Sequence, residues 1–153
     1  MELLQFNDGN SFASGVLRYE YRSISNDTTN RILIPIEIES GIKIEAVLDT
    51  GAPYPILDPN LAPLAGYTRR LALDTMTMNI RGAKLLGKIA RLMFTLRADK
   101  GNDMHVQATV FIPDSTELWE LYNFPSFLGQ AGFLERIRFA IDPTENKFYF
   151  GTP

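Results

Sequence analysis

The chain has no cysteine and only one histidine, His105, among its 153 residues. Without cysteine it can form no disulfide, no thiolate nucleophile and no cysteine-based zinc site. One histidine excludes multi-histidine metal sites and leaves a single candidate base for a Ser-His-Asp triad. We expect His105 to be an ordinary strand or loop residue, and we expect neither a metal nor a cofactor.

The chain also lacks long apolar runs and a large excess of charge. No uninterrupted apolar segment approaches the ~20 residues that a membrane-spanning helix needs. Residues 1–5 lack the basic region and the apolar core of a signal peptide. The net charge of −3 gives no overall electrostatic reason to bind nucleic acid. We therefore expect a soluble, cytoplasmic protein with no transmembrane segment and no nucleic-acid partner.

What is present favours one globular domain made of strands. Hydrophobic residues make up 45% of the chain and charged residues 22%, which is typical of a domain with a sizeable core. Short apolar runs alternate with turns, and only one short helix is expected, over residues 130–136. The pattern predicts an all-β barrel or sandwich. The expected strands are 17–22, the hairpin 32–38 with 42–48, and the hairpin 139–141 with 148–150; the proline-rich residues 53–63 are expected to form a loop.

Residues 85–96 fit two structures. Their leucines recur at helical spacing opposite Lys84, Lys88 and Arg91, which indicates a basic amphipathic helix of the kind that lies on anionic membranes. The same stretch also alternates apolar and polar residues, as a strand does. Because Gly87 interrupts a helix and the surroundings are β, a strand is favoured, and the helix stays open as the alternative.

The strongest motif is the run 46–52, Ala-Val-Leu-Asp-Thr-Gly-Ala. Its apolar start predicts a strand buried on both faces, which ends by presenting the carboxylate of Asp49 beside a hydroxyl and a glycine. A carboxylate there is costly unless it is hydrogen-bonded, paired or used. The tripeptide alone also fits an ordinary strand that ends in a turn. Farther along, Phe127-Leu128-Gly129 repeats the apolar-apolar-glycine theme before the closing hairpin.

This order of motifs resembles that of the retropepsin-like aspartic proteases, including their bacterial members, over about residues 32–150. The resemblance implies an all-β, single-lobe acid-protease fold, a closed β-barrel with one short helix near the C-terminus. The domain would span residues 32–153. Residues 1–31 would form a strand-containing extension, and whether it is a removable pro-segment stays open.

The family has two Asp-Thr/Ser-Gly motifs per active site, and this chain has one. The other Asp-Thr pair, Asp74-Thr75, is followed by methionine and cannot make the same turn. The resemblance therefore implies a homodimer in which the Asp49 carboxylates of two copies meet. It implies an endopeptidase that cleaves peptide or protein substrates next to apolar side chains, by a water activated between the two carboxylates. The implied catalytic residues are Asp49, Thr50 and Gly51.

A flap, a hairpin that closes over substrate, is implied between residues 71 and 91. The implied substrate-binding residues are Leu48 and Ala52 beside the motif, and Ile80, Arg81 and Gly82 at the flap tip. Two other functions stay open. One is a non-catalytic retropepsin-fold module that binds peptides or dimerises. The other is a β-domain that binds membranes or partners through the basic segment 81–97.

Overall fold

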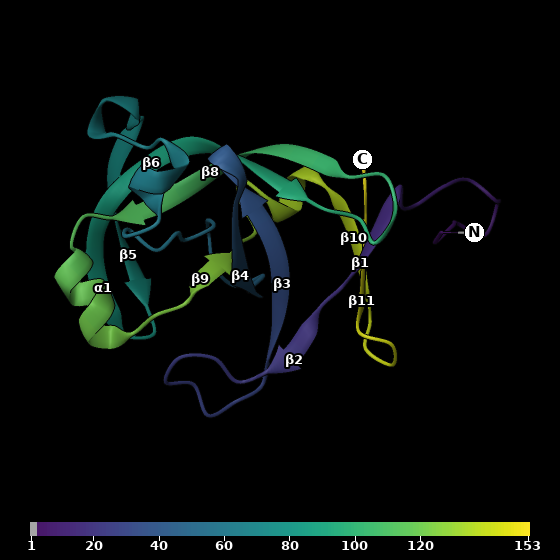
Figure 1. Cartoon of the computed structure of the whole chain (residues 1–153), viewed down its shortest axis with the longest axis horizontal. Coiled ribbons are helices and arrows are strands. Elements are labelled where there is room, and N and C mark those ends of the chain that lie inside the picture. The colour runs from purple at the N-terminus through teal and green to yellow at the C-terminus, as the bar shows by residue number, and fades with distance from the viewer. Residues whose placement is uncertain (1–2) are drawn as a thin grey trace.

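The computed structural model describes residues 3–153, which form eleven strands, one α-helix and four short 3-10 segments (Figure 1). The strands are β1 (Gly15–Arg18), β2 (Glu20–Arg22), β3 (Arg31–Ile38), β4 (Ile42–Leu48), β5 (Asp74–Ile80), β6 (Ala83–Leu96), β7 (Lys100–Gly101), β8 (Met104–Pro113), β9 (Ser126–Leu128), β10 (Arg138–Asp142) and β11 (Lys147–Gly151). The helix is α1 (Thr116–Tyr122), and the 3-10 segments are η1 (Glu39–Gly41), η2 (Ala62–Ala65), η3 (Arg69–Leu71) and η4 (Leu134–Arg136).

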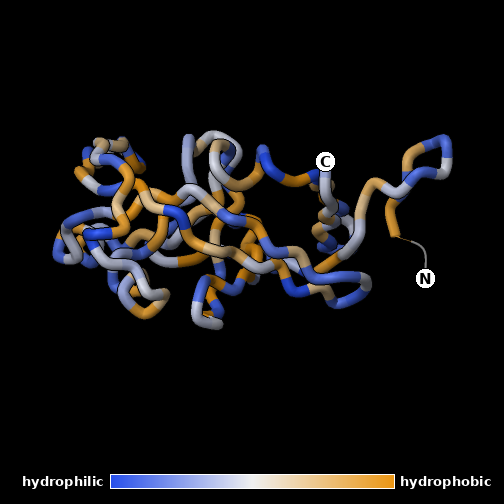
Figure 2. Tube along the Cα trace, turned by 90° about the horizontal axis from the view of Figure 1, so that it is seen from above, coloured by the Kyte–Doolittle hydropathy of each residue, from blue (hydrophilic) through white to orange (hydrophobic). Residues whose placement is uncertain are grey.

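The strands form two sheets. The larger has the order β5-β6-β3-β4-β9, with β2 paired to β3 and β8 paired to β6. The smaller has the order β10-β11-β1-β7 and contains the strands nearest the two termini. Figures 1 and 2 show both ends of the chain at the same side of the molecule, away from the larger sheet. The expected all-β class is confirmed.

The expected closed barrel is wrong, because no sheet closes on itself. The gap lies between β8 and β9, and residues 55–57 fill it. The Ile56 backbone bridges Phe111 of β8 on one side and Phe127 of β9 on the other. The Phe111 N–H donates to the Pro55 carbonyl, and the Leu57 N–H donates to the Phe111 carbonyl. Ile56 lies in the proline-rich loop, and prolines have no N–H to extend a ladder. A three-residue segment therefore stands where a closing strand would be needed.

The hairpin β3–β4 is the centre of the molecule. Its residues face two apolar clusters in alternation: Ile34 and Ala46 belong to the larger cluster, while Leu33 and Val47 belong to the cluster under β5 and β6. The hairpins expected at 32–48 and 139–150 are both present. Burial on both faces explains why the end of β4, residues 46–48, is apolar at consecutive positions, as the sequence predicted.

Residues 83–96 are a strand, so the alternative of a basic amphipathic helix is wrong. Ala90, Leu92 and Phe94 are all buried on the core side of β6. The whole second half of β6 pairs with β8, from Gly87 to Leu96. A Cβ on Gly87 would lie 2.5 Å from the Ile112 carbonyl oxygen, which explains the glycine in the strand. The pairing with β8 therefore outweighs the helical spacing of the leucines.

The helix expected over residues 130–136 is also wrong. Gly132 has a φ of +83° and Phe133 a φ of −143°, so only η4 remains helical there. The described α-helix is α1, whose first turn is capped by Ser115: its hydroxyl accepts a hydrogen bond from the Leu118 N–H at 3.1 Å. Trp119 of α1 is buried and packs in the smaller apolar cluster.

The expected strand 17–22 is divided between the two sheets. β1 pairs with β11 and β7, whereas β2 pairs with β3. The buried Tyr19 lies between the two strands, where the chain leaves one sheet for the other. The N-terminal extension thus contributes a strand to each sheet.

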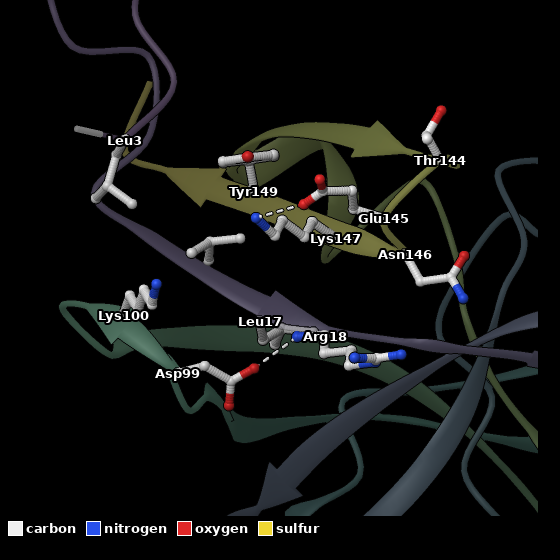
Figure 3. A pocket seen from close by; sticks show the side chains of 11 residues that line it. Leu3, Leu17, Arg18, Asp99, Lys100, Thr144, Glu145, Asn146, Lys147 and Tyr149 are labelled. Atoms are coloured by element: carbon white, nitrogen blue, oxygen red, sulfur yellow. Dashed lines mark hydrogen bonds and ion pairs between the residues drawn. The ribbon is translucent and has the colours of Figure 1, made fainter. Parts of the chain in front are cut away.

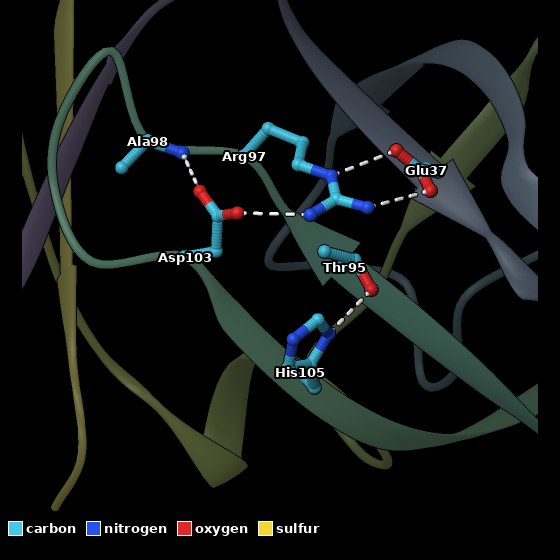
Figure 4. A network of polar contacts seen from close by, with 6 residues as sticks. All are labelled: Glu37, Thr95, Arg97, Ala98, Asp103 and His105. Atoms are coloured by element: carbon cyan, nitrogen blue, oxygen red, sulfur yellow. Dashed lines mark hydrogen bonds and ion pairs between the residues drawn. The ribbon is translucent and has the colours of Figure 1, made fainter.

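Arg97 joins β3 to the turn between β6 and β8 (Figure 4). Its guanidinium donates to both carboxylate oxygens of Glu37, at 2.9 and 3.0 Å, and to Asp103 at 2.9 Å. Asp103 also accepts a hydrogen bond from the Ala98 N–H at 2.7 Å. The bond from Arg97 lowers the pKa of Glu37, and the bond from the Ala98 N–H, followed by that from Arg97, lowers the pKa of Asp103. His105 is bonded to Thr95 beside this cluster, at 2.8 Å.

This cluster predicts an acid-sensitive part of the stability. Because the folded pKa of each carboxyl lies below its ordinary value, its stabilising effect is present at neutral pH and is lost as the pH falls through the folded pKa. We expect the melting temperature of Arg97→Gln to fall less steeply than that of wild type below pH 4.5, the ordinary value for Glu37. The control is Arg91→Gln, since Arg91 makes no ion pair among residues 3–153. Equal acid slopes in wild type and Arg97→Gln would contradict the prediction.

Candidate active site

Asp49 follows β4 directly and is held by backbone hydrogen bonds. Its own N–H donates to the Leu128 carbonyl at 3.0 Å, and its carboxylate oxygen Oδ1 accepts from the Gly51 N–H at 3.0 Å. The Ala52 N–H closes the turn on the Asp49 carbonyl at 3.1 Å. The Asp49 side chain is therefore oriented by the turn that its own motif forms, and the residue is half-buried while Thr50 and Gly51 are exposed.

The second motif lies directly against the first. β9 runs parallel to β4, with Val47 opposite Phe127 and Leu48 opposite Leu128. Gly129 then passes so close to the Asp49 loop that a Cβ on it would lie 2.3 Å from the Tyr54 carbonyl oxygen. Beyond Gly129, the N–H groups of residues 130 and 131 donate to the carbonyls of residues 52 and 53 at 2.8 and 2.7 Å. The glycine thus allows β9 to support the loop that carries Asp49.

A cavity of about 270 Å³ opens beside Asp49. One wall is the Asp49 loop and the opposite wall is the end of the β5–β6 hairpin, with Phe127 of β9 between them. Six of the eight residues named from the sequence line this cavity: Leu48, Asp49, Gly51, Ala52, Ile80 and Arg81. Thr50 and Gly82 do not line it, and both are exposed, one in the Asp49 loop and the other in the hairpin turn.

The hairpin end has the two-residue turn Arg81-Gly82. Their φ angles are +49° and +85°, the signature of a type I′ turn. Ile80, next to the turn, is buried with Met78 and Phe127 in the smaller apolar cluster. The hairpin end is thus anchored to β9 by packing, close to the residues that precede Gly129.

The structure adds two charged residues that the sequence analysis did not place at the site, Arg31 and Asp27. Arg31, at the start of β3, lines the cavity and donates to Asp27 at 2.6 Å. Arg81 donates to the same carboxylate oxygen at 3.2 Å. The bond from Arg31 and that from the Thr29 N–H lower the pKa of Asp27, while the bond to Asp27 raises the pKa of Arg31. A polar residue at the start of a strand is ordinary, so no local signal marks Arg31.

A larger cavity, about 530 Å³, lies on the smaller sheet (Figure 3). It shares no lining residue with the cavity beside Asp49. Its acidic groups already have partners: Glu145 pairs with Lys147 at 2.9 Å, and Asp99 accepts the Arg18 N–H at 2.7 Å. It contains neither of the two sequence motifs.

No family model matches the chain, and neither does any curated protein. Among residues 3–153, the structure contains no helix both long and apolar enough to cross a membrane. The fold is similar to the crystal structure of a retropepsin-like aspartic protease from Rickettsia conorii. The match covers 88% of this chain and 97% of that one, with 18% identity and a TM-score of 0.51. The chain therefore has the fold of the retropepsin-like aspartic proteases, the family that its two motifs resemble.

Proposed function

We propose that the chain is an aspartic endopeptidase whose active site is completed by a second copy. The observation that carries the proposal is the position of Asp49: a carboxylate fixed by the Gly51 N–H, at the end of a buried strand, opening into a cavity beneath a hairpin. The chain has one Asp-Thr-Gly motif. A pair of such carboxylates then requires two chains related by a two-fold axis.

The proposed chemistry needs only the two carboxylates and a water molecule. Two carboxyl groups in contact share one proton, because both cannot be ionised at once. The ionised member takes a proton from the water, which attacks the scissile carbonyl carbon, and the protonated member donates to the carbonyl oxygen. The tetrahedral product of this step then breaks its C–N bond as a proton passes to the leaving nitrogen. No covalent enzyme intermediate is formed.

The exposed face of the Asp49 loop is where the second copy would lie. Thr50 and Gly51 are exposed there although neighbouring residues are buried. In the proposed dimer, the Thr50 hydroxyl bonds to the partner's loop across the axis. In Figure 1 the end of the β5–β6 hairpin, the β2–β3 loop and the β10–β11 turn all lie at the lower side of the molecule. These segments would border the partner.

Residues 32–153 are proposed as the protease domain and residues 1–31 as an extension. Since β1 pairs with β11 and β2 pairs with β3, removal of the extension would leave two strand edges unpaired. This pairing favours an extension that stays in place over a pro-segment that is cut away.

The cavity walls support apolar side chains next to the scissile bond. Leu48, Ile56 and Phe127 line it together with the hairpin residues Met78 and Ile80. Burying one apolar substrate side chain of ordinary size in such a wall contributes about 1.5–3 kcal/mol. We therefore expect cleavage between or beside apolar residues.

A peptide-library digest from pH 3 to pH 7 tests the proposed function. We expect cleavage beside apolar residues, with inhibition by a statine-type compound that mimics the tetrahedral intermediate. Sedimentation over a range of protein concentrations should show a dimer under the conditions of cleavage. Peptide binding without any cleavage would instead identify a non-catalytic peptide-binding module.

A further inference from the structure

Arg81 adopts a backbone conformation that suits other residues better. It is the first residue of the type I′ turn, with a φ of +49°. Asparagine and glycine adopt this conformation at less cost than a long side chain does. When a residue beside a functional cavity is held in an unfavourable backbone conformation, a function of its side chain is the hypothesis to test.

The Arg81 side chain reaches back into the cavity. Its guanidinium carbon lies 5.3 Å from the centre of the Phe127 ring, within the range of a cation–π contact. It lines the cavity together with Arg31 and Asp49. The turn therefore places a cation against Phe127 in the candidate active site.

Arg31 and Arg81 share a single internal anion. Both donate to Oδ2 of Asp27, whose side chain is only 9% exposed. A guanidinium has five N–H donors, and within the described residues neither arginine makes a further side-chain hydrogen bond. Both cations bond one nearly buried carboxylate, Asp27, and share the cavity with Asp49, but several of their N–H donors have no partner among the described residues.

We propose that Arg31 and Arg81 form a subsite for an acidic side chain of the peptide substrate. Two guanidinium groups can bind a carboxylate by charge-assisted hydrogen bonds, and these two already bind the carboxylate of Asp27 in this way. The inference rests on the proposed function, because it assumes that a peptide occupies the cavity. It adds to the apolar preference at the scissile bond, since the two arginines line the same cavity as the apolar residues.

The variant Arg81→Asn separates this role from a structural one. Asn-Gly is a favoured type I′ pair, so the substitution keeps the turn and should preserve or raise the unfolding midpoint. Arg81→Lys keeps the positive charge but not the planar fork. Arg70→Gln is the matched control, since Arg70 does not line the cavity. The substrates are amidated peptides that differ only by Glu or Gln at each position around an apolar cleavage site.

Wild type should cleave the best Glu peptide about tenfold to a hundredfold faster than its Gln partner, measured as kcat/KM. The ratio of kcat/KM for the Glu peptide to that for the Gln peptide should approach one in Arg81→Asn, stay partly above one in Arg81→Lys and be unchanged in Arg70→Gln. A folded Arg81→Asn with an unchanged ratio would overturn the proposal. The same peptides are also made with a free C-terminal carboxylate. If that carboxylate raises kcat/KM for the Gln peptide to the value of the Glu peptide, the proposal is overturned, because the subsite would then bind the chain end and not an acidic side chain.

The same peptides test the inference without catalysis. Their binding to the full chain, followed by fluorescence anisotropy, should be tighter for Glu than for Gln, and Arg81→Asn should remove the difference. If no peptide is cleaved but this difference is present, the proposed function fails and the acidic subsite stands. If peptides are cleaved with no Glu preference, the subsite fails and the protease stands.

Discussion

Replacing Asp49 with asparagine should abolish peptide cleavage and leave the fold unchanged. The side-chain amide cannot take a proton from water or share one with a second carboxyl group, and loss of positioned acid–base catalysis costs about 10²–10⁴-fold in rate. Asp49 accepts one described hydrogen bond, from the Gly51 N–H. An amide oxygen can accept the same bond, so the unfolding midpoint should move little.

The comparison is made with Asp74→Asn. Asp74 begins β5, belongs to the other Asp-Thr pair and is exposed, with its Oδ1 accepting only the Thr75 N–H at 2.7 Å. The two variants lose the same charge, but only the Asp49 variant should lose activity in a fixed-concentration peptide assay. Cleavage that survives in the Asp49 variant would show that another group activates the water.

Replacing Gly129 with alanine should destabilise the protein and disable the site together. The new Cβ would lie 2.3 Å from the Tyr54 carbonyl oxygen and 2.8 Å from that of Ala52. Both atoms belong to the backbone that follows Asp49, so neither can move without moving the Asp49 loop. Overpacking of this kind costs about 1–3 kcal/mol, and more where backbone must shift. Urea unfolding monitored by tryptophan fluorescence would measure the loss.

Gly87→Ala is the matched variant for this prediction. Its Cβ would be equally crowded, 2.5 Å from the Ile112 carbonyl oxygen, but Gly87 does not line the cavity beside Asp49. Both variants should lose stability. Under conditions where each is still folded, Gly87→Ala should keep its activity per folded molecule and Gly129→Ala should lose it. Equal residual activities would mean that Gly129 acts on stability alone.

The parts of the fold that could be predicted are those set by local pattern and burial. β4 is apolar at successive positions because Ala46 and Val47 face different clusters, and this is visible in the sequence. β6 could be predicted only with help from its surroundings, since its leucines also fit a helix. Helix α1 was missed although Ser115 caps it, while the helix expected at 130–136 is interrupted at Gly132. A glycine with positive φ looks the same in sequence as one that begins a helix.

The candidate site, like the fold, could be predicted from the sequence only in part. Asp49 and Gly129 could be found because their chemistry and spacing are local to two short motifs. The incomplete closure of the larger sheet could not be predicted, because it depends on which residues of a proline-rich loop reach between β8 and β9, and residues 55–57 do so. The cluster of Arg31, Arg81 and Asp27 joins the β2–β3 loop, the start of β3 and the β5–β6 turn. No local sequence pattern predicts a contact among three segments that are separate in the chain.

The most direct test of the account is to mix wild type with the inactive Asp49→Asn variant. In the proposed dimer each of the two chains supplies one catalytic carboxylate, so a mixed dimer has a single Asp49 and is inactive. With wild type held constant at a concentration where it is dimeric, and after subunit exchange, activity should fall in proportion to the wild-type fraction as the variant is added. Activity that stays constant through a large excess of the variant would show that each chain carries a complete active site.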